Sequence, residues 1–145
     1  MKLADYYING DIRRDFLAQD YVKFINYGRI KLDCTATKKR KWNLDKKSEL
    51  IDSLLKGYPM NPFYLLEKDG RYECIDGNMR SVTLAEFMND EFALTGMDDE
   101  ELNGKYFSEF DEDSNSMICS ALLKVVILQN RNEKELGEII ERLEL

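Results

Sequence analysis

One short segment of this sequence combines the residue types that phosphate chemistry needs. It reads Asp76-Gly77-Asn78-Met79-Arg80 and lies between a strand-like run and a helical pattern. The N-terminus of a helix presents unpaired backbone N–H groups and a partial positive charge, so it can hold a phosphate. Gly77 lets the backbone approach that phosphate, and Arg80 can add a bidentate, charge-assisted hydrogen bond. Asp76 can face a magnesium ion or orient a water molecule.

The same segment also has a purely structural interpretation. Asp76 would cap the helix and Gly77 would make the turn. Arg80 would pair with Asp76 or with Glu73. The residue types alone leave both interpretations open.

The residues that the sequence lacks exclude several kinds of chemistry. His is absent from all 145 residues, which excludes His-based triads, His–metal sites and a His general base. No GxxxxGK[ST] motif occurs, so P-loop NTPase chemistry is excluded too.

The cysteines are Cys34, Cys74 and Cys119. Because they are odd in number and widely spaced, they favour a reducing cytoplasm over a disulfide framework or a zinc site. No apolar run reaches the ~20 residues of a membrane helix.

The elements around this segment follow from the hydrophobic pattern. Strand-like runs at 62–68 and 71–75 are joined by Asp69-Gly70, which predicts a hairpin that leads into the Asp76-Gly77 turn. A helix is then predicted over about 78–88. We expect further helices at 11–26, 46–57 and 132–145, a buried strand at 123–130, and short strands at 29–34 and 91–96.

This mixture of elements favours an α+β fold in a chain long enough for one domain. Local signals mark several of the helix ends. Ser48 lies in the expected N-cap region of the second helix and Gly57 ends it. Asn132 and Glu135 have the spacing of a capping box at the start of the last helix.

Charge is distributed unevenly along the chain, whose net charge is −7. Residues 38–47 carry a local charge of +5, whereas residues 86–113 contain eleven acidic residues and one lysine. The net charge argues against a general nucleic-acid coat protein. The basic segment can still contact phosphates or DNA, through Lys38, Lys39, Arg40 and Lys41.

Several motifs occur in a fixed order along the chain. Arg40 and Trp42 precede the helical sequence Leu50-Ile51-Asp52-Ser53-Leu54-Leu55, then come Pro59 and Pro62, and then Ile75-Asp76-Gly77-Asn78-Met79-Arg80. In this order, over about residues 28–145, the chain resembles the N-terminal domain of GmrSD-type modification-dependent restriction enzymes. That family is related in fold to ParB and sulfiredoxin domains. The resemblance implies a small mixed sheet with packed helices in a domain over residues 28–145. We expect an N-terminal helical segment at 1–27 to form one compact unit with that domain.

The resemblance also implies a function for the segment after the hairpin. The domain would bind a nucleoside triphosphate with Mg²⁺ through Arg40, Gly77, Asn78 and Arg80. Asp76 would be the metal ligand, and Asp76 and Arg80 the catalytic residues of any NTPase activity. The setting would be DNA metabolism or anti-phage defence in a prokaryote or phage.

Two departures from the family pattern affect these expectations. The family has two glutamines where this chain has Asn78 and Met79. Methionine cannot hydrogen-bond or position a water as glutamine does, so nucleotide binding is expected more than hydrolysis. Without His, the HNH nuclease carried by larger family members is excluded for this chain. The open alternative is a non-catalytic DNA- or protein-binding regulatory module, acting as a homodimer or with a larger homologue.

Overall fold

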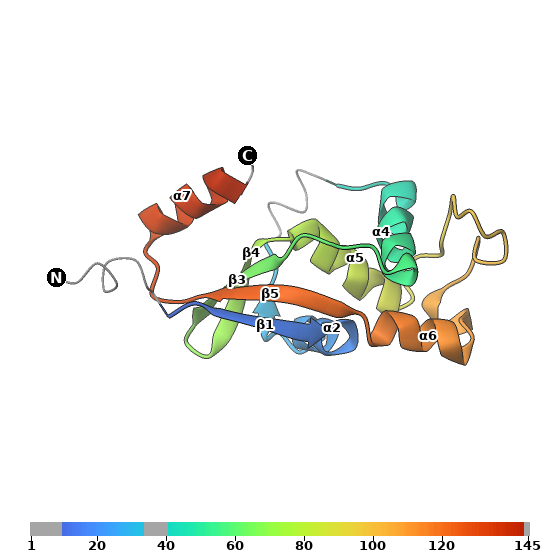
Figure 1. The fold of residues 1–145 in the computed structure, drawn as a ribbon, viewed down its shortest axis with the longest axis horizontal. Coiled ribbons are helices and arrows are strands. Elements are labelled where there is room, and N and C mark those ends of the chain that lie inside the picture. Colours follow the sequence, from blue (N-terminus) through green and yellow to red (C-terminus); the bar gives the residue numbers. More distant parts are fainter. Residues whose placement is uncertain (1–9, 34–40, 144–145) are drawn as a thin grey trace.

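A five-stranded mixed sheet organises the described residues, 10–33 and 41–143, in the computed structural model (Figure 1). Across the sheet the strands are β1 (Ile12–Leu17), β5 (Leu122–Leu128), β3 (Phe63–Lys68), β4 (Arg71–Asp76) and β2 (Ile30–Lys31). β5 runs antiparallel to β1 and parallel to β3, β3 is antiparallel to β4, and β2 is parallel to β4. The α+β prediction is confirmed, while the relation to ParB and sulfiredoxin folds stays a prediction.

Helices pack on both faces of this sheet. The first face carries α2 (Ala18–Asn26), α4 (Leu44–Lys56), α5 (Asn78–Met88) and α6 (Glu112–Cys119). The second face carries α7 (Glu133–Leu143), whose Leu136 and Ile139 pack on Leu66, Val126 and Leu128. None of the helices in the described part of the chain is long and apolar enough to cross a membrane.

The hairpin before the candidate segment is confirmed. Asp69 and Gly70, both with positive φ, join β3 to β4. The pairing then shifts register, because Leu65 lies opposite Cys74 but Tyr64 lies opposite Asp76. This β-bulge leaves Ile75 as an extra residue and changes the direction of the end of β4. Such a bulge sets where Asp76 lies relative to the rest of the sheet.

Helix and strand predictions made from local signals are largely confirmed. α4 ends at Gly57, whose φ is 71°. At α7, Asn132 and Glu135 form the predicted capping box, with hydrogen bonds of 2.8 and 3.2 Å. The N-cap of α4 is Asn43 rather than the region of Ser48. Ser48 is buried, and its Oγ accepts a 2.9 Å hydrogen bond from the backbone N–H of Thr95 and lies 3.4 Å from Oγ1 of the same residue.

The continuous helix predicted over 11–26 is wrong. Its first half is β1, which pairs along its whole length with β5, and only its second half is α2. The pairing joins Ile12 to Ile127, and such a distant partner leaves no local signal in the sequence. The short strand predicted at 91–96 is also wrong, because that segment is a loop. A short 3₁₀ helix at Phe107–Glu109 and helix α6 were not predicted.

Candidate functional site

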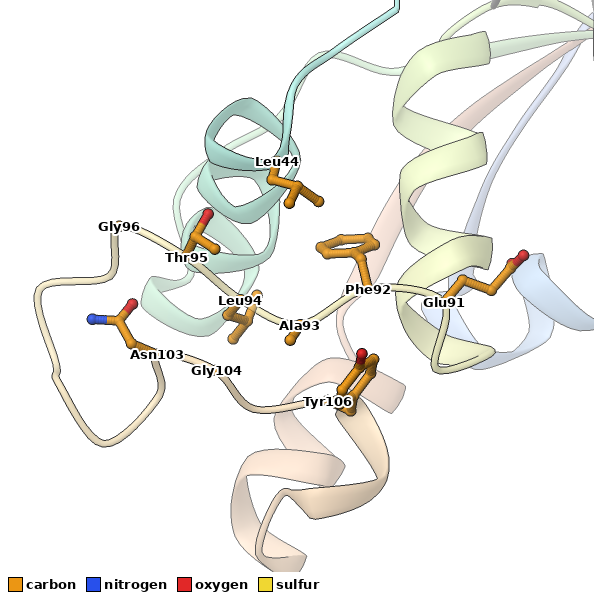
Figure 2. A pocket seen from close by; sticks show the side chains of 10 residues that line it. All are labelled: Leu44, Glu91, Phe92, Ala93, Leu94, Thr95, Gly96, Asn103, Gly104 and Tyr106. Carbon is orange, nitrogen blue, oxygen red and sulfur yellow. The ribbon is translucent and has the colours of Figure 1, made fainter.

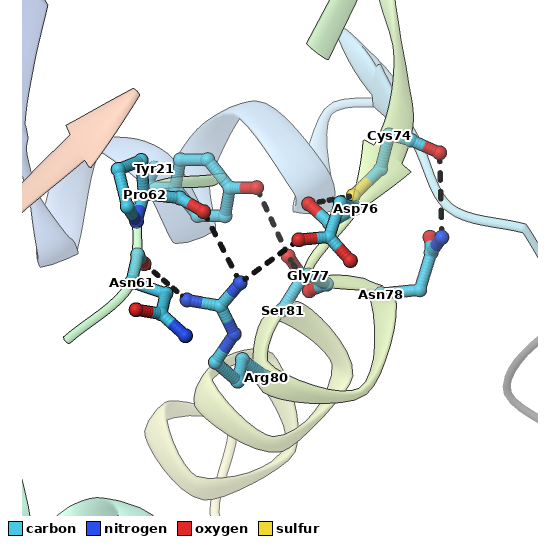
Figure 3. A network of polar contacts seen from close by, with 9 residues as sticks. All are labelled: Tyr21, Asn61, Pro62, Cys74, Asp76, Gly77, Asn78, Arg80 and Ser81. Carbon is cyan, nitrogen blue, oxygen red and sulfur yellow. Dashed lines mark hydrogen bonds and ion pairs between the residues drawn. The ribbon is translucent and has the colours of Figure 1, made fainter. Parts of the chain in front are cut away.

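The candidate segment forms the turn from β4 into α5, as the sequence predicts (Figure 3). Gly77 is the N-cap residue of α5 and has a φ of 100°, which L side chains rarely adopt. A Cβ atom at this position would lie 2.7 Å from Cδ2 of Phe63 and 3.0 Å from Nη2 of Arg80. The turn therefore requires glycine for two reasons, its backbone conformation and the close approach of two side chains.

Within residues 10–33 and 41–143, no side chain caps the N-terminus of α5, and no acidic residue lies in its first turn. The N-terminus of α4 is capped by Asn43 and that of α6 by Asp111. The predicted capping role of Asp76 is therefore wrong. The first N–H groups of a helix have no acceptor within it, so α5 presents donors without a side-chain cap at this turn, next to the carboxylate of Asp76.

Arg80 is held beside this turn by several contacts. Its guanidinium donates hydrogen bonds to the backbone carbonyls of Asn61 and Pro62, the second at 3.2 Å, and lies 4.3 Å from the centre of the Phe63 ring. Its Nη2 is 3.7 Å from Oδ2 of Asp76, which is a long ion pair. Burial lowers the pKa of Arg80 and Asp76 opposes that shift, but an arginine stays charged in proteins.

Asp76 is the more accessible member of this pair. Its side chain is 44% exposed, against 16% for Arg80. Among the described residues, no group of three or more His, Cys, Asp or Glu side chains could hold a metal ion together. Asp76 would thus offer one carboxylate. That fits Mg²⁺, which is commonly held by one or two carboxylates together with phosphate oxygens and water.

The side chain of Asn78 is engaged within the protein. It is buried, its Oδ1 accepts a 2.8 Å hydrogen bond from the backbone N–H of Asp33, and its Nδ2 donates to the carbonyl of Cys74 at 3.3 Å. These contacts fix the start of α5 against the segment after β2. What Asn78 presents at the turn is its backbone N–H.

Three residues behind the turn were not predicted from the sequence. Ser81 donates its hydroxyl to the carbonyl of Gly77 at 2.7 Å, and the hydroxyl of Tyr21 lies 2.9 Å from Ser81 Oγ (Figure 3). The thiol of Cys74 donates to the carbonyl of Asp76 at 3.5 Å. Burial raises the pKa of Cys74 to about 12 and that of Tyr21 well above its usual range, so both stay neutral at physiological pH. They position the turn, and Tyr21 reaches it from α2.

The basic segment is only partly within the described residues. Lys38, Lys39 and Arg40 lie outside them, so the predicted phosphate contact of Arg40 stays a prediction. Lys41 is exposed. The other lysines of the segment make contacts within the protein: Nζ of Lys46 lies 5.5 Å from the centre of the Trp42 ring, and Lys47 forms a 2.8 Å ion pair with Glu86. DNA binding through this segment likewise stays a prediction.

A separate cavity of about 510 Å³ lies between the start of α4 and the loop over residues 91–106 (Figure 2). Its lining includes Leu44, Phe92, Leu94 and Tyr106 and no lysine or arginine. A cavity without cationic side chains does not suit a phosphate. It shares no lining residue with the turn at Gly77, so it is not part of the predicted site.

Comparison with known proteins agrees with these motifs. No curated protein and no solved structure matches the chain. The family profile of the GmrSD restriction endonuclease N-terminal domain matches residues 38–144. This range covers well over half of the chain and contains the β3–β4 hairpin, the Gly77 turn and α5. The chain belongs to the GmrSD restriction endonuclease N-terminal domain family.

Proposed function

We propose that this domain binds a nucleoside triphosphate, with its phosphates at the N-terminus of α5, as part of a restriction system that acts in defence. The observation that carries the proposal is the uncapped start of α5 between a fixed arginine and an accessible carboxylate. The first turn offers backbone N–H donors without a capping side chain. Arg80 adds a positive charge and Asp76 a ligand for Mg²⁺.

The contacts of Arg80 suit it to receive a phosphate. Two of its N–H groups are directed at the carbonyls of Asn61 and Pro62, which fixes the plane of the guanidinium. An arginine has five N–H donors, so others remain for a ligand. Because the contact with Asp76 is as long as 3.7 Å, a phosphate oxygen can take the place of that carboxylate at small cost.

Binding is proposed ahead of hydrolysis. Asp76 is the group at the turn that can orient a water molecule, and Met79 offers no hydrogen bond to assist it. Mg²⁺, when bound with the nucleotide, would neutralise phosphate charge. The residues of this chain then hold and orient the phosphates through Arg80 and the α5 amides.

Thermal unfolding in the presence of ATP, GTP, CTP or UTP, each with Mg²⁺, tests the proposal. A nucleotide at ~100 times its dissociation constant stabilises a protein by ~2.7 kcal/mol, which raises the Tm by several degrees for a domain of this size. We expect such a shift with at least one nucleotide. Asp76→Asn should remove the part of the shift that depends on Mg²⁺, and Arg80→Lys should reduce the shift with and without Mg²⁺.

Asp69→Asn is the matched control, because it makes the same charge change in the turn between β3 and β4, at the opposite end of β4 from Asp76. It should leave the nucleotide-induced shift unchanged. The proposal fails if no nucleotide shifts the Tm. It also fails if Asp76→Asn and Arg80→Lys respond to nucleotide as the control does.

A further inference from the structure

The second face of the sheet carries a pocket of about 310 Å³ close to the Gly77 turn. We refer to it as the sheet-face pocket, and its lining includes Arg13, Asp15, Pro62, Tyr64, Lys124 and Val126. It differs from the cavity beside α4 in having basic side chains in its lining. A pocket of this size is at the lower end of the range that holds small ligands.

The strand register shows how this pocket is connected to the candidate site. Arg13 is opposite Val126, Val126 is opposite Tyr64, and Tyr64 is opposite Asp76. These four residues form one row across β1, β5, β3 and β4. With strands ~4.8 Å apart, the row extends roughly 14 Å from the carboxylate of the candidate site to the far rim of the pocket.

Pro62 forms a wall that the two sites share. Its carbonyl accepts a hydrogen bond from Arg80, and the residue also lines the sheet-face pocket. A ligand whose phosphates lie beside Arg80 can therefore continue past Pro62 onto the second face. The distance along the row suits one nucleotide rather than an inorganic phosphate chain alone.

The chemistry of the pocket fits a planar ring with polar edges. Tyr64 and Val126 belong to the hydrophobic cluster of the second face and give an apolar floor on which a base can stack. Arg13, Asp15 and Lys124 also line the pocket and are exposed. Asp15 lies opposite Lys124 in the register of β1 and β5, yet within residues 10–33 and 41–143 none of the three forms an ion pair. Their donors and the Asp15 acceptor are thus available to base edges and ribose hydroxyls.

We propose that the sheet-face pocket receives the base and ribose of the nucleotide whose phosphates lie at α5. This inference rests on the proposed function, since it needs a nucleotide at the Gly77 turn. It assigns recognition of the base and ribose to four residues. Tyr64 would stack on the base, and Arg13, Asp15 and Lys124 would contact the base edges and the ribose hydroxyls.

Calorimetric titration of the full chain with Mg²⁺ complexes of the four nucleotides and of inorganic tripolyphosphate tests this inference. The nucleotide that binds should do so about tenfold more tightly than tripolyphosphate, because only the nucleotide reaches the pocket. Tyr64→Leu should remove most of that difference and leave tripolyphosphate binding unchanged. Tyr27→Leu is the control, since Tyr27 is 80% exposed and lies at the end of α2.

The outcomes separate this inference from the proposed function. If nucleotides and tripolyphosphate bind equally, or if Tyr64→Leu keeps the difference, the pocket is not the base site and phosphate binding at α5 stands. If neither binds, both proposals fail. Should Tyr64→Leu fail to fold, Asp15→Asn and Lys124→Gln take its place, because both residues are exposed. If both of these variants keep the full difference in affinity between nucleotide and tripolyphosphate, the inference is overturned. Tight binding of a single-stranded oligonucleotide without binding of any mononucleotide overturns it as well.

Discussion

Arg80 is fixed by its neighbours before any ligand arrives. Hydrogen bonds to two consecutive carbonyls and the ring of Phe63 hold its guanidinium in one plane. Side-chain entropy that would otherwise be lost on binding is already lost in the folded protein. A preorganised arginine of this kind favours recognition of a group with defined geometry, such as a phosphate.

Cys74 gives the stability of the domain a defined pH dependence. Burial raises the pKa of its thiol from the ordinary 9.0 to about 12, so the thiol stays protonated in the folded protein while it ionises in the unfolded chain. The stabilisation is complete below pH 9 and is lost as the pH rises from 9 towards 12. Over that window, this residue should lower the free energy of unfolding by about 1.4 kcal/mol per pH unit.

Urea unfolding between pH 7 and 10 checks this prediction. Cys74→Ala should flatten the loss of stability above pH 9, although its stability at pH 7 will be lower because a buried side chain is shortened. Cys119→Ala, at a half-buried position in α6, should keep a slope closer to that of the unmodified chain. An unchanged slope in Cys74→Ala would show that the buried thiol is not the group that titrates.

The residues of the site could be predicted from the sequence only where local spacing determines them. The order of strand, turn and helix indicates that Asp76, Gly77 and Arg80 lie together. The use of the Asn78 side chain could not be predicted, because its partner Asp33 is 45 residues away. The same holds for Tyr21, which reaches Ser81 across 60 residues from another helix.

Among the elements, the connection from β4 to α5 depends most on a single residue. Gly77 and Gly70 both have positive φ, but only at Gly77 would a Cβ meet other atoms, since nothing lies within 4 Å of one at Gly70. Gly77→Ala should therefore destabilise the domain by about 1 kcal/mol or more beyond Gly70→Ala, which reports the backbone strain alone.

Chemical unfolding of the two variants measures this difference. Because Phe63 and Arg80 must shift to admit the added methyl group, Gly77→Ala should also weaken any nucleotide-induced rise in Tm. Gly70→Ala should keep it. Equal losses of stability in the two variants would mean that the close approach to Phe63 does not constrain the turn.

Elements with strong local signals were the predictable ones. The hairpin follows from Asp69-Gly70, and the capping box of α7 from Asn132 and Glu135. β1 could not be predicted, since its six residues are strand only through their pairing with β5. The isolated pattern of this segment resembles a helix, and the long-range partner overrides that local preference.

At the scale of the whole molecule, the sheet extends beyond the region that matches the family. The match begins at residue 38, yet β1, α2 and β2 precede it. Phe16, Tyr21 and Val22 from that part are buried in the main core. The N-terminal part is thus integral to the same hydrophobic core.

A chain that begins at residue 38 should therefore fail to fold. It would lose both outer strands of the sheet, leave the edges of β5 and β4 unpaired, and open the core where Tyr21 and Phe16 pack. Circular dichroism during heating should show no cooperative transition. The full chain contains all these elements and should unfold cooperatively. A cooperative transition in the shorter chain would contradict the prediction.

The position of β5 also has a consequence for how the protein is made. β1 leaves the ribosome more than a hundred residues before its partner, since Ile12 pairs with Ile127. At about 5–20 residues per second, translation of that stretch takes roughly 6 to 23 seconds. During that time β1 has no strand to pair with, and its charged run Arg13-Arg14-Asp15 is the kind of sequence that discourages pairing with another nascent chain. Arg13 and Asp15, which we propose to contact the base in the folded protein, would thus first limit association between nascent chains.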